Sequence, residues 1–313
     1  MAHEIKFGTG ILTKIIECFT KIFIKKYGPN GNAFGLDHTD STKASPRTPL
    51  SFLYSSFSSL LKLKQTPPAS TKHSTAEPDY NANFRKAITE IKAFRDVLIK
   101  LFQQQTQYSK NFANVTWTSE ENILVFEAVN GLLFGWSDQF YLCIMSLIGS
   151  VLREKQAEFA NQTDIMKHWS TKEFQIHTPA RLQGESHAYL GAIEAMNMIS
   201  QHFTPEDKFK SIHAVQVEIA RGADNQWEED DLKKSVRKPI DQEDQLLHLY
   251  TFVISRCGGG KLLCDLYFVE QFLESAKLTQ SEFSFAFNIL NSTVSHVLSL
   301  KKQKAPKNSG DDF

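Results

Sequence analysis

The chain has 313 residues, which is enough for one large domain or two ordinary domains with a sizeable core. Its 35 Lys and Arg balance its 35 Asp and Glu, and a formal charge of zero argues against a general nucleic-acid binder, although not against a local basic patch. The four cysteines show no C-x-x-C pairing, so we expect reduced, mostly buried thiols rather than a disulfide framework or a zinc site.

The first predicted element is a basic amphipathic helix within residues 1–27. Apolar residues from Ile11 to Phe23 follow helical spacing, while Lys14, Lys21 and Lys25 gather on another face. Such a helix can lie on an anionic membrane or pack its apolar stripe against the rest of the protein, and the sequence leaves both alternatives open. Lysines interrupt the segment and no small-residue cleavage site follows, so it is not a standard export signal.

Residues 28–78 are rich in Ser, Thr, Pro, Gly and Asn and are expected to be a low-complexity linker. One apolar island in it, from Phe52 to Leu63, could dock onto a neighbouring element. Residues 79–184 are expected to form a helical bundle. Its first helix is indicated by apolar spacing from Phe84 to Leu101.

The second helix of the predicted bundle begins at a capping box made by Thr118 and Glu121. It is expected to run to about Phe159, with a break near Gly131 and Gly135. Its most apolar part approaches the ~20 residues needed to span a bilayer. Because polar residues interrupt that part, a buried helix in a soluble chain is predicted instead. Residues 160–184 are expected to be polar and irregular.

The last unit is predicted over residues 185–300 and begins with a helix over 186–203. A helix-start signal at Thr204–Asp207 opens the next helix, which is expected to end near Gly222. A polar loop, a helix headed by Asp244, a further helix and a final helix follow. Gly258–Gly260 is expected to end the helix headed by Asp244, and apolar spacing from Leu262 to Leu273 indicates the next helix. A capping box of Thr279 and Glu282 begins the final helix, and a polar tail over 301–313 follows it. No alternating strand pattern competes, so the predicted fold is all-α.

The helix headed by Asp244 carries the most informative pattern. Asp244, His248, Thr251 and Ser255 recur at helical spacing and share one polar stripe. Four apolar residues are expected to face the core: Leu246, Leu249, Tyr250 and Val253. A carboxylate in the first turn is favoured by the helix dipole, so Asp244 could be a helix-start signal and no more.

Motifs of covalent chemistry are not found in the sequence. Gly258-Gly-Gly-Lys261 lacks the preceding strand, the first glycine and the Ser or Thr of a phosphate-binding loop, and we interpret it as a helix stop. The ten histidines include no H-E-x-x-H pattern, and no G-x-S-x-G elbow occurs. No metal site, cofactor or bond-making enzyme activity is therefore predicted.

Three ordered blocks between residues 187 and 300 resemble the vacuolar-protein-sorting-nine (Vps-nine) domain, a layered helical module that exchanges nucleotide on early-endosomal Rab GTPases. The first block joins Ala192-Ile193 to Pro205-Glu-Asp207-Lys208-Phe209-Lys-Ser-Ile212, and is similar to "A-I … P-x-D-K-L-x-x-I". The second runs from Glu243-Asp244-Gln-Leu246-Leu247-His248 to Ile254 and on through Lys261 to Val269, and is similar to "A-D-D-L-L-P-x-L-x-Y-V-I" and "R-L-L-S-N-I-Q-Y-I". The third, from Leu278 to Asn288, loosely matches "G-E-x-G-Y-Y-x-T-N-L". Members of the family usually have a helical bundle in front of this domain.

The resemblance implies a guanine-nucleotide exchange factor that makes and breaks no bond. An acidic residue at the Asp244 position would reach into the GTPase nucleotide site and meet the lysine of its phosphate loop. The resemblance places the GTPase-binding surface at His248, Thr251, Phe283, Ser284, Phe287 and Asn288. This chain departs from the family pattern: the family's proline falls on His248, its active-site tyrosine on Ser284 and its threonine on Phe287.

The implied partner is a small GTPase of the early-endosomal Rab group, with peripheral membrane contact through residues 5–27 as a further expectation. The divergence of the blocks, the Ser- and Thr-rich linker and the short polar tail together resemble a secreted bacterial effector of the Legionella kind. Such an effector would act in the host cytoplasm, on endosomal membranes and in vesicle trafficking. Two alternatives remain open: a module that binds a GTPase without exchanging its nucleotide, and a membrane-associated helical scaffold.

Overall fold

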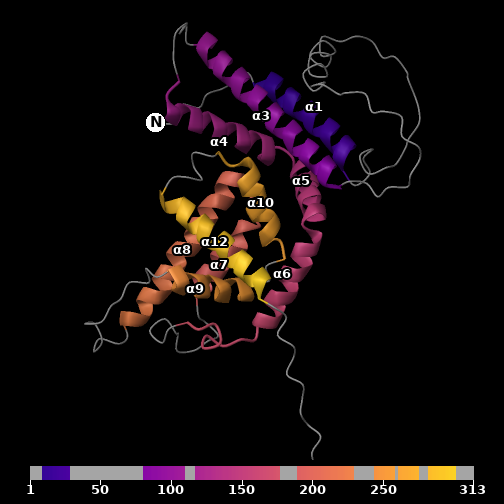
Figure 1. Ribbon diagram of the computed structural model, residues 1–313. Coiled ribbons are helices and arrows are strands. Elements are labelled where there is room, and N and C mark those ends of the chain that lie inside the picture. The colour runs from indigo at the N-terminus through magenta and orange to yellow at the C-terminus, as the bar shows by residue number, and fades with distance from the viewer. Residues whose placement is uncertain are drawn as a thin grey trace, which may run out of the picture. The chain divides into compact units, whose positions relative to one another are not determined.

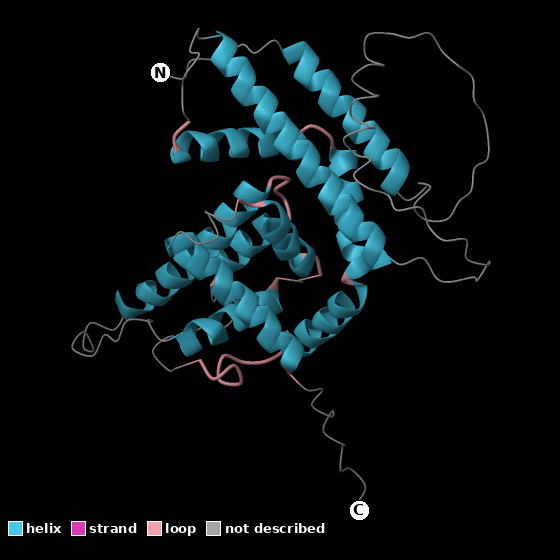
Figure 2. Ribbon diagram, turned by 45° about the horizontal axis from the view of Figure 1, so that its top comes forward, coloured by secondary structure: helices cyan, strands magenta, loops and turns pink. Residues whose placement is uncertain are grey.

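A computed structural model describes residues 9–28, 80–109, 117–176, 189–228, 243–257, 260–274 and 281–300. Every regular element within these ranges is an α-helix, which confirms the all-α prediction (Figures 1 and 2). The Phe52–Leu63 island, Thr279 of the last capping box and the tail from residue 301 lie outside the described residues. The chain divides into two compact units, residues 1–100 and 101–313.

In the first unit, α1 (Thr9–Tyr27) lies beside α3 (Tyr80–Ser109) (Figures 1 and 2). The Phe19 and Phe94 rings stack with their centroids 3.7 Å apart, and Lys26 Nζ donates to Glu90 Oε1 at 2.5 Å. On α1 the side chains of Ile16, Phe23 and Tyr27 are buried. Of the two alternatives for this helix, its apolar stripe therefore packs within the protein, and the stripe is not available for insertion into a membrane.

The predicted second helix of the bundle is three helices, α4 (Ser119–Gly135), α5 (Asp138–Val151) and α6 (Arg153–Met166). The predicted capping box is present, because the Glu121 N–H donates to Thr118 Oγ1 at 3.2 Å and the Thr118 N–H donates to Glu121 Oε2 at 2.9 Å. The chain breaks just after Gly135, near the predicted position, and Ser137 caps α5 by accepting the Phe140 N–H. The irregular segment predicted from residue 160 begins only after Met166.

Among the described helices, none by itself is long and apolar enough to cross a membrane. The bent pair of α4 and α5, at 93° to each other, meets the length and composition criteria only when the two are taken together.

The described part of the second unit continues with five more helices. They are α7 (Leu190–Ile199), α8 (Pro205–Glu228), α9 (Glu243–Arg256), α10 (Leu262–Phe272) and α12 (Ser281–Ser299). In Figure 1, α12 crosses the group formed by α7, α8 and α9. Their shared core includes fully buried Ile212, Leu249, Phe252, Val253 and Leu290.

Two helix ends differ from their predicted positions for reasons that involve Tyr189. Its backbone takes φ 58°, in the left-handed region, so α7 cannot extend upstream to residue 186. Helix α8 passes through Gly222 and ends six residues later. A Cβ atom on Gly222 would lie 2.8 Å from the buried Tyr189 ring. Gly222 therefore permits close helix packing and is not a helix stop.

The helices in front of α7 pack onto this group. The buried Asn130 side chain of α4 donates to Glu206 Oε1 at the start of α8, at 2.7 Å, and to the Phe272 carbonyl at the end of α10, at 3.2 Å. Helix α6 contacts both α9 and α12. In the second unit, α4–α6 thus pack against the later helices and support them.

Candidate functional site

The described part of the stripe predicted on α9 runs from half-buried His248 into the core. Asp244 is the second residue of the helix and lies in its first turn, and the structure describes its backbone but not its side chain. His248, one turn further, is half-buried. Thr251 and Ser255 are buried, and their hydroxyls donate to the Leu247 and Phe252 carbonyls of their own helix at 2.7 Å.

Thr251 is therefore corrected from a GTPase-contacting residue to a core residue. At 3 % exposure it presents no surface to a partner, and its hydroxyl bonds within the helix. The opposite face of α9 follows the prediction, since Leu246, Leu249, Tyr250 and Val253 are all buried. These four side chains hold α9 in the core.

The first turns of α12 place one aromatic ring at the surface and one in the core. Phe283 is 36 % exposed, whereas Phe287 is 5 % exposed and contacts the buried Phe209 of α8 edge-on at 5.9 Å between centroids. Phe287 is thus a core aromatic, and its predicted role in direct GTPase contact is not supported by its burial. Ser284 is half-buried and Asn288 is exposed.

A histidine that the sequence interpretation missed lies against Phe283. The His213 ring of α8 has its centroid 4.4 Å from that of Phe283, and Phe209 stacks on Phe283 at 5.6 Å. Phe209 and His213 are four residues apart, so the sequence alone could have predicted that they share one face of α8. The pairing of α8 with α12 needed the tertiary structure. Phe283 and His213 together form an aromatic contact that reaches solvent.

A buried charge pair ties three helices of this unit together. Lys208 Nζ donates to Asp265 Oδ1 at 2.7 Å and to the Ile199 carbonyl at 2.8 Å, while the Ser200 hydroxyl donates to Asp265 Oδ2 at 2.6 Å. Lys208 and Asp265 are 0 % and 1 % exposed. Burial lowers the pKa of Lys208, and the neighbouring Asp265 carboxylate acts in the opposite direction. The pair links the end of α7, the start of α8 and α10.

Arg256 anchors the end of α9 that lies opposite Asp244. Its guanidinium donates to the Met166 and Lys167 carbonyls from Nη1 and to the Trp169 carbonyl from Nη2 at 2.7 Å. These carbonyls belong to the last turn of α6 and the turn that follows it, where helix carbonyls lack intrahelical partners. Helix α9 is therefore held at its C-terminal end by the preceding bundle.

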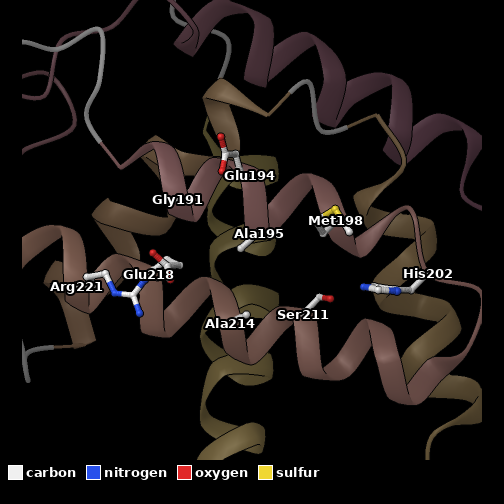
Figure 3. Close-up of a pocket in the computed structure, with 9 residues that line it drawn as sticks. All are labelled: Gly191, Glu194, Ala195, Met198, His202, Ser211, Ala214, Glu218 and Arg221. Atoms are coloured by element: carbon white, nitrogen blue, oxygen red, sulfur yellow. Dashed lines mark hydrogen bonds and ion pairs between the residues drawn. The ribbon is translucent and has the colours of Figure 1, made fainter.

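A groove of about 470 Å³ lies between α7 and α8 (Figure 3). Glu218 and Arg221 form an ion pair at one end of it, at 2.7 Å, and His202 lies at the other end. The Glu218 carboxylate lies over Gly191, where a Cβ atom would come within 2.5 Å of it. The groove contains none of the residues predicted for GTPase binding.

No group of three His, Cys, Asp or Glu side chains in the described ranges is placed to hold a metal ion. What the site offers is an acidic helix start, a half-buried His248 and an exposed aromatic contact on a helix that packs against both α8 and α9. These are features of a protein-binding surface.

Comparison with known proteins identifies this group of helices. The sequence model of the family described as the vacuolar sorting protein 9 (VPS9) domain matches residues 189–302, from just before α7 to just past α12. No curated protein matches the chain significantly. A VPS9 domain implies guanine-nucleotide exchange on a Rab GTPase, in support of vesicle trafficking and without bond chemistry. The chain therefore carries a VPS9 domain at residues 189–302, and its implied partner is a Rab GTPase.

Proposed function

We propose that the chain accelerates nucleotide release from Rab GTPases of the early-endosomal group, with Asp244 as the acidic residue that enters the nucleotide site. Two observations support the proposal: the VPS9 match over residues 189–302, and the resemblance of the second sequence block, in which Asp244 stands at the acidic position. Asp244 lies in the first turn of α9, and the opposite end of α9 is anchored by Arg256. A helix that is anchored at one end and carries an acid in the first turn of the other suits insertion of that acid into a partner.

The proposed mechanism is electrostatic competition. The phosphate-loop lysine of a GTPase neutralises phosphate charge, and a carboxylate brought beside it competes for the same cation. At about 4 Å and an effective dielectric constant of about 20, that interaction is worth about 4 kcal/mol. A carboxylate there also repels the phosphates and disfavours the metal ion. The nucleotide-free GTPase is stabilised relative to the loaded form, so release becomes faster.

The remaining contact surface is proposed to consist of His248 on α9 and of Phe283 and Asn288 on α12. His248 is half-buried, one turn from Asp244, and Asn288 is exposed. Phe283 is backed by His213 and Phe209, which limits the rotamers it can adopt. A pre-positioned aromatic ring loses little entropy on binding and suits the centre of an interface.

The test is release of a fluorescent guanine nucleotide from purified early-endosomal Rab proteins and from Rab proteins of other compartments. Asp244→Ala should slow release at least about tenfold, which corresponds to about 1.4 kcal/mol of lost transition-state stabilisation. Asp244→Asn should be similarly slow, because the amide lacks the charge. Asp138→Ala is the matched control, since it also removes an acid from the first turn of a helix, α5, where Asp138 is exposed. Exchange by wild type that is no faster than by Asp244→Ala would remove the proposal.

A second candidate function is GTPase binding without exchange, and Ser284 favours it. Ser284 stands at the position of the family's tyrosine, and a hydroxymethyl group cannot span the distance that a phenol covers. A pull-down that retains the GTPase while nucleotide release stays at the uncatalysed rate would select this function. Ser284→Tyr should then raise the exchange rate.

The cellular setting is proposed from sequence alone. The divergence of the blocks, the Ser- and Thr-rich linker and the polar tail suggest a secreted bacterial effector that acts in the host cytoplasm, on endosomal membranes. Expression of the tagged chain in animal cells, with markers for early endosomes and for other compartments, tests the endosomal part. A translocation-reporter fusion tests secretion.

A further inference from the structure

The zero net charge of the chain hides a strong separation of charge between its two units. Residues 1–100 contain fifteen Lys and Arg against eight Asp and Glu, whereas the remainder contains twenty against twenty-seven. Within the described helical part of the first unit, nine basic residues stand against three acidic ones. The first unit is therefore cationic and the second anionic, and a charged surface would attract one and repel the other.

Helix α1 concentrates part of this charge on a single exposed row. Lys14, Cys18, Lys21 and Lys25 are all exposed and are three or four residues apart, so they follow one face of the helix. The buried positions Ile16, Thr20, Phe23 and Tyr27 follow the opposite face. Glu17 pairs with Lys21 at 2.6 Å and offsets part of the charge. The row from Lys14 to Lys25 spans about 16 Å along the axis.

We propose that this row, Lys14, Lys21 and Lys25, is a docking surface for an anionic lipid bilayer, and that it binds by charge and not by insertion of the helix. Insertion would need the apolar stripe, which is covered by α3 through the Phe19–Phe94 stack. A row of lysines gains about 1 kcal/mol per residue beside an anionic leaflet, which is about fivefold in partitioning. The proposal is independent of nucleotide exchange.

A bilayer fits the row better than nucleic acid does. Binding of single strands needs exposed aromatic rings on which bases stack. Here Phe19 stacks on Phe94, and Phe23 and Tyr27 are buried. The large apolar residue exposed beside the row is Ile22, at 42 % exposure, and an aliphatic side chain is accommodated at the boundary between headgroups and acyl chains.

The experiment is co-flotation of the full chain with phosphatidylcholine vesicles, with or without phosphatidylserine, over a range of salt concentrations. Wild type should bind only the vesicles with phosphatidylserine and should dissociate as salt rises. Lys14→Gln, Lys21→Gln and Lys25→Gln combined should weaken binding about a hundredfold. The matched control combines Lys155→Gln, Lys167→Gln and Lys172→Gln, three exposed lysines of the second unit, and should bind as wild type does.

Cys18 supplies a second readout at the middle of the row. It is exposed, whereas Cys143, Cys257 and Cys264 are buried, so a thiol-reactive dye should label Cys18 selectively in the native protein. An environment-sensitive dye at Cys18 should change its emission on anionic vesicles alone. A dye attached at residue 155, in a Lys155→Cys and Cys18→Ser variant, should not respond.

Three results would overturn the proposal. Equal flotation with neutral and anionic vesicles, or binding that survives high salt, would indicate apolar insertion. Equal losses in the two triple variants would show that the row is not the contact. Release of the protein from anionic vesicles by a small excess of single-stranded RNA would indicate a nucleic-acid surface instead. Exchange activity in solution should be the same in wild type and both triple variants, which separates this test from that of Asp244.

Discussion

At the scale of single residues, the buried pair of Lys208 and Asp265 is the contact whose loss we expect to cost the most stability. Asp265→Ala leaves the Lys208 ammonium buried without its carboxylate, which typically costs about 3–5 kcal/mol. Asp265→Asn keeps an oxygen acceptor toward Lys208 Nζ and should cost clearly less. Urea unfolding at pH 7 measures both. Equal losses of unfolding free energy in the two variants would show that the acceptor oxygen kept by Asp265→Asn contributes nothing once the charge is removed.

The two rings on α12 should respond differently to truncation. Phe287→Ala removes a buried ring and should lower the free energy of unfolding by about 3–5 kcal/mol. Phe283 is partly exposed, so Phe283→Ala should cost much less stability but should slow nucleotide exchange. Thermal unfolding and nucleotide release, measured on the same preparations, check this. The assignment of Phe283 to the contact surface is contradicted if exchange by Phe283→Ala equals that of wild type.

At the site, the sequence predicted the burial of some single residues but not of others. The pattern on α9 correctly placed Leu246, Leu249, Tyr250 and Val253 in the core, because helical periodicity determines which side chains share a face. It did not predict the burial of Thr251, since a face that is polar in sequence can still be covered by another element when each hydroxyl bonds to its own helix.

At the scale of elements, the anchoring of α9 by Arg256 is the arrangement most open to test. Arg256→Ala removes donors to three carbonyls at the end of α6 and should destabilise the protein by about 1.5–3 kcal/mol. Arg256→Lys should recover only part of this, because one ammonium lacks the planar fork of donors.

If the anchor also orients Asp244, exchange by Arg256→Ala should be reduced even at a temperature where the variant is fully folded. Circular dichroism fixes that temperature and nucleotide release is measured there. Full activity of the folded variant would make Arg256 a stabilising residue alone.

Element boundaries show where local patterns were sufficient. Capping signals at Thr118 and at Thr204 correctly predicted the starts of α4 and α8, since a cap is a contact between residues three apart. Glycines did not predict helix ends equally well. Gly135 ends α4, but Gly222 lies inside α8, and the difference is the Tyr189 ring packed against it, which no local pattern contains.

At the scale of the whole molecule, the buried thiols and phenols predict how stability depends on alkaline pH. Burial raises the pKa of Cys143 to about 11 and those of Cys257 and Cys264 to about 12, and it also raises the pKa values of Tyr141, Tyr189 and Tyr250. Raised values mean that the folded state holds protons that the unfolded chain releases. The stabilisation is complete below the unfolded thiol pKa and is lost as pH rises from about 9 toward 12.

Urea unfolding at pH 8 and at pH 10.5 should therefore show a lower midpoint at the higher pH. Thiol titration at pH 8 supplies the control: Cys18 should react at once, and the three buried thiols only on unfolding. An unchanged midpoint would mean that these groups keep similar pKa values in the unfolded chain.

The sequence by itself determined the all-α fold, the core face of α9 and the identity of the VPS9 domain, because periodicity, caps and ordered motif blocks are properties of neighbouring residues. Only the tertiary structure decided that α1 buries its apolar stripe against α3, that Arg256 anchors α9 to the end of α6, and that Phe283 lies on His213. Each of these contacts joins residues far apart in the chain, so its energy depends on a packing arrangement that no local pattern encodes.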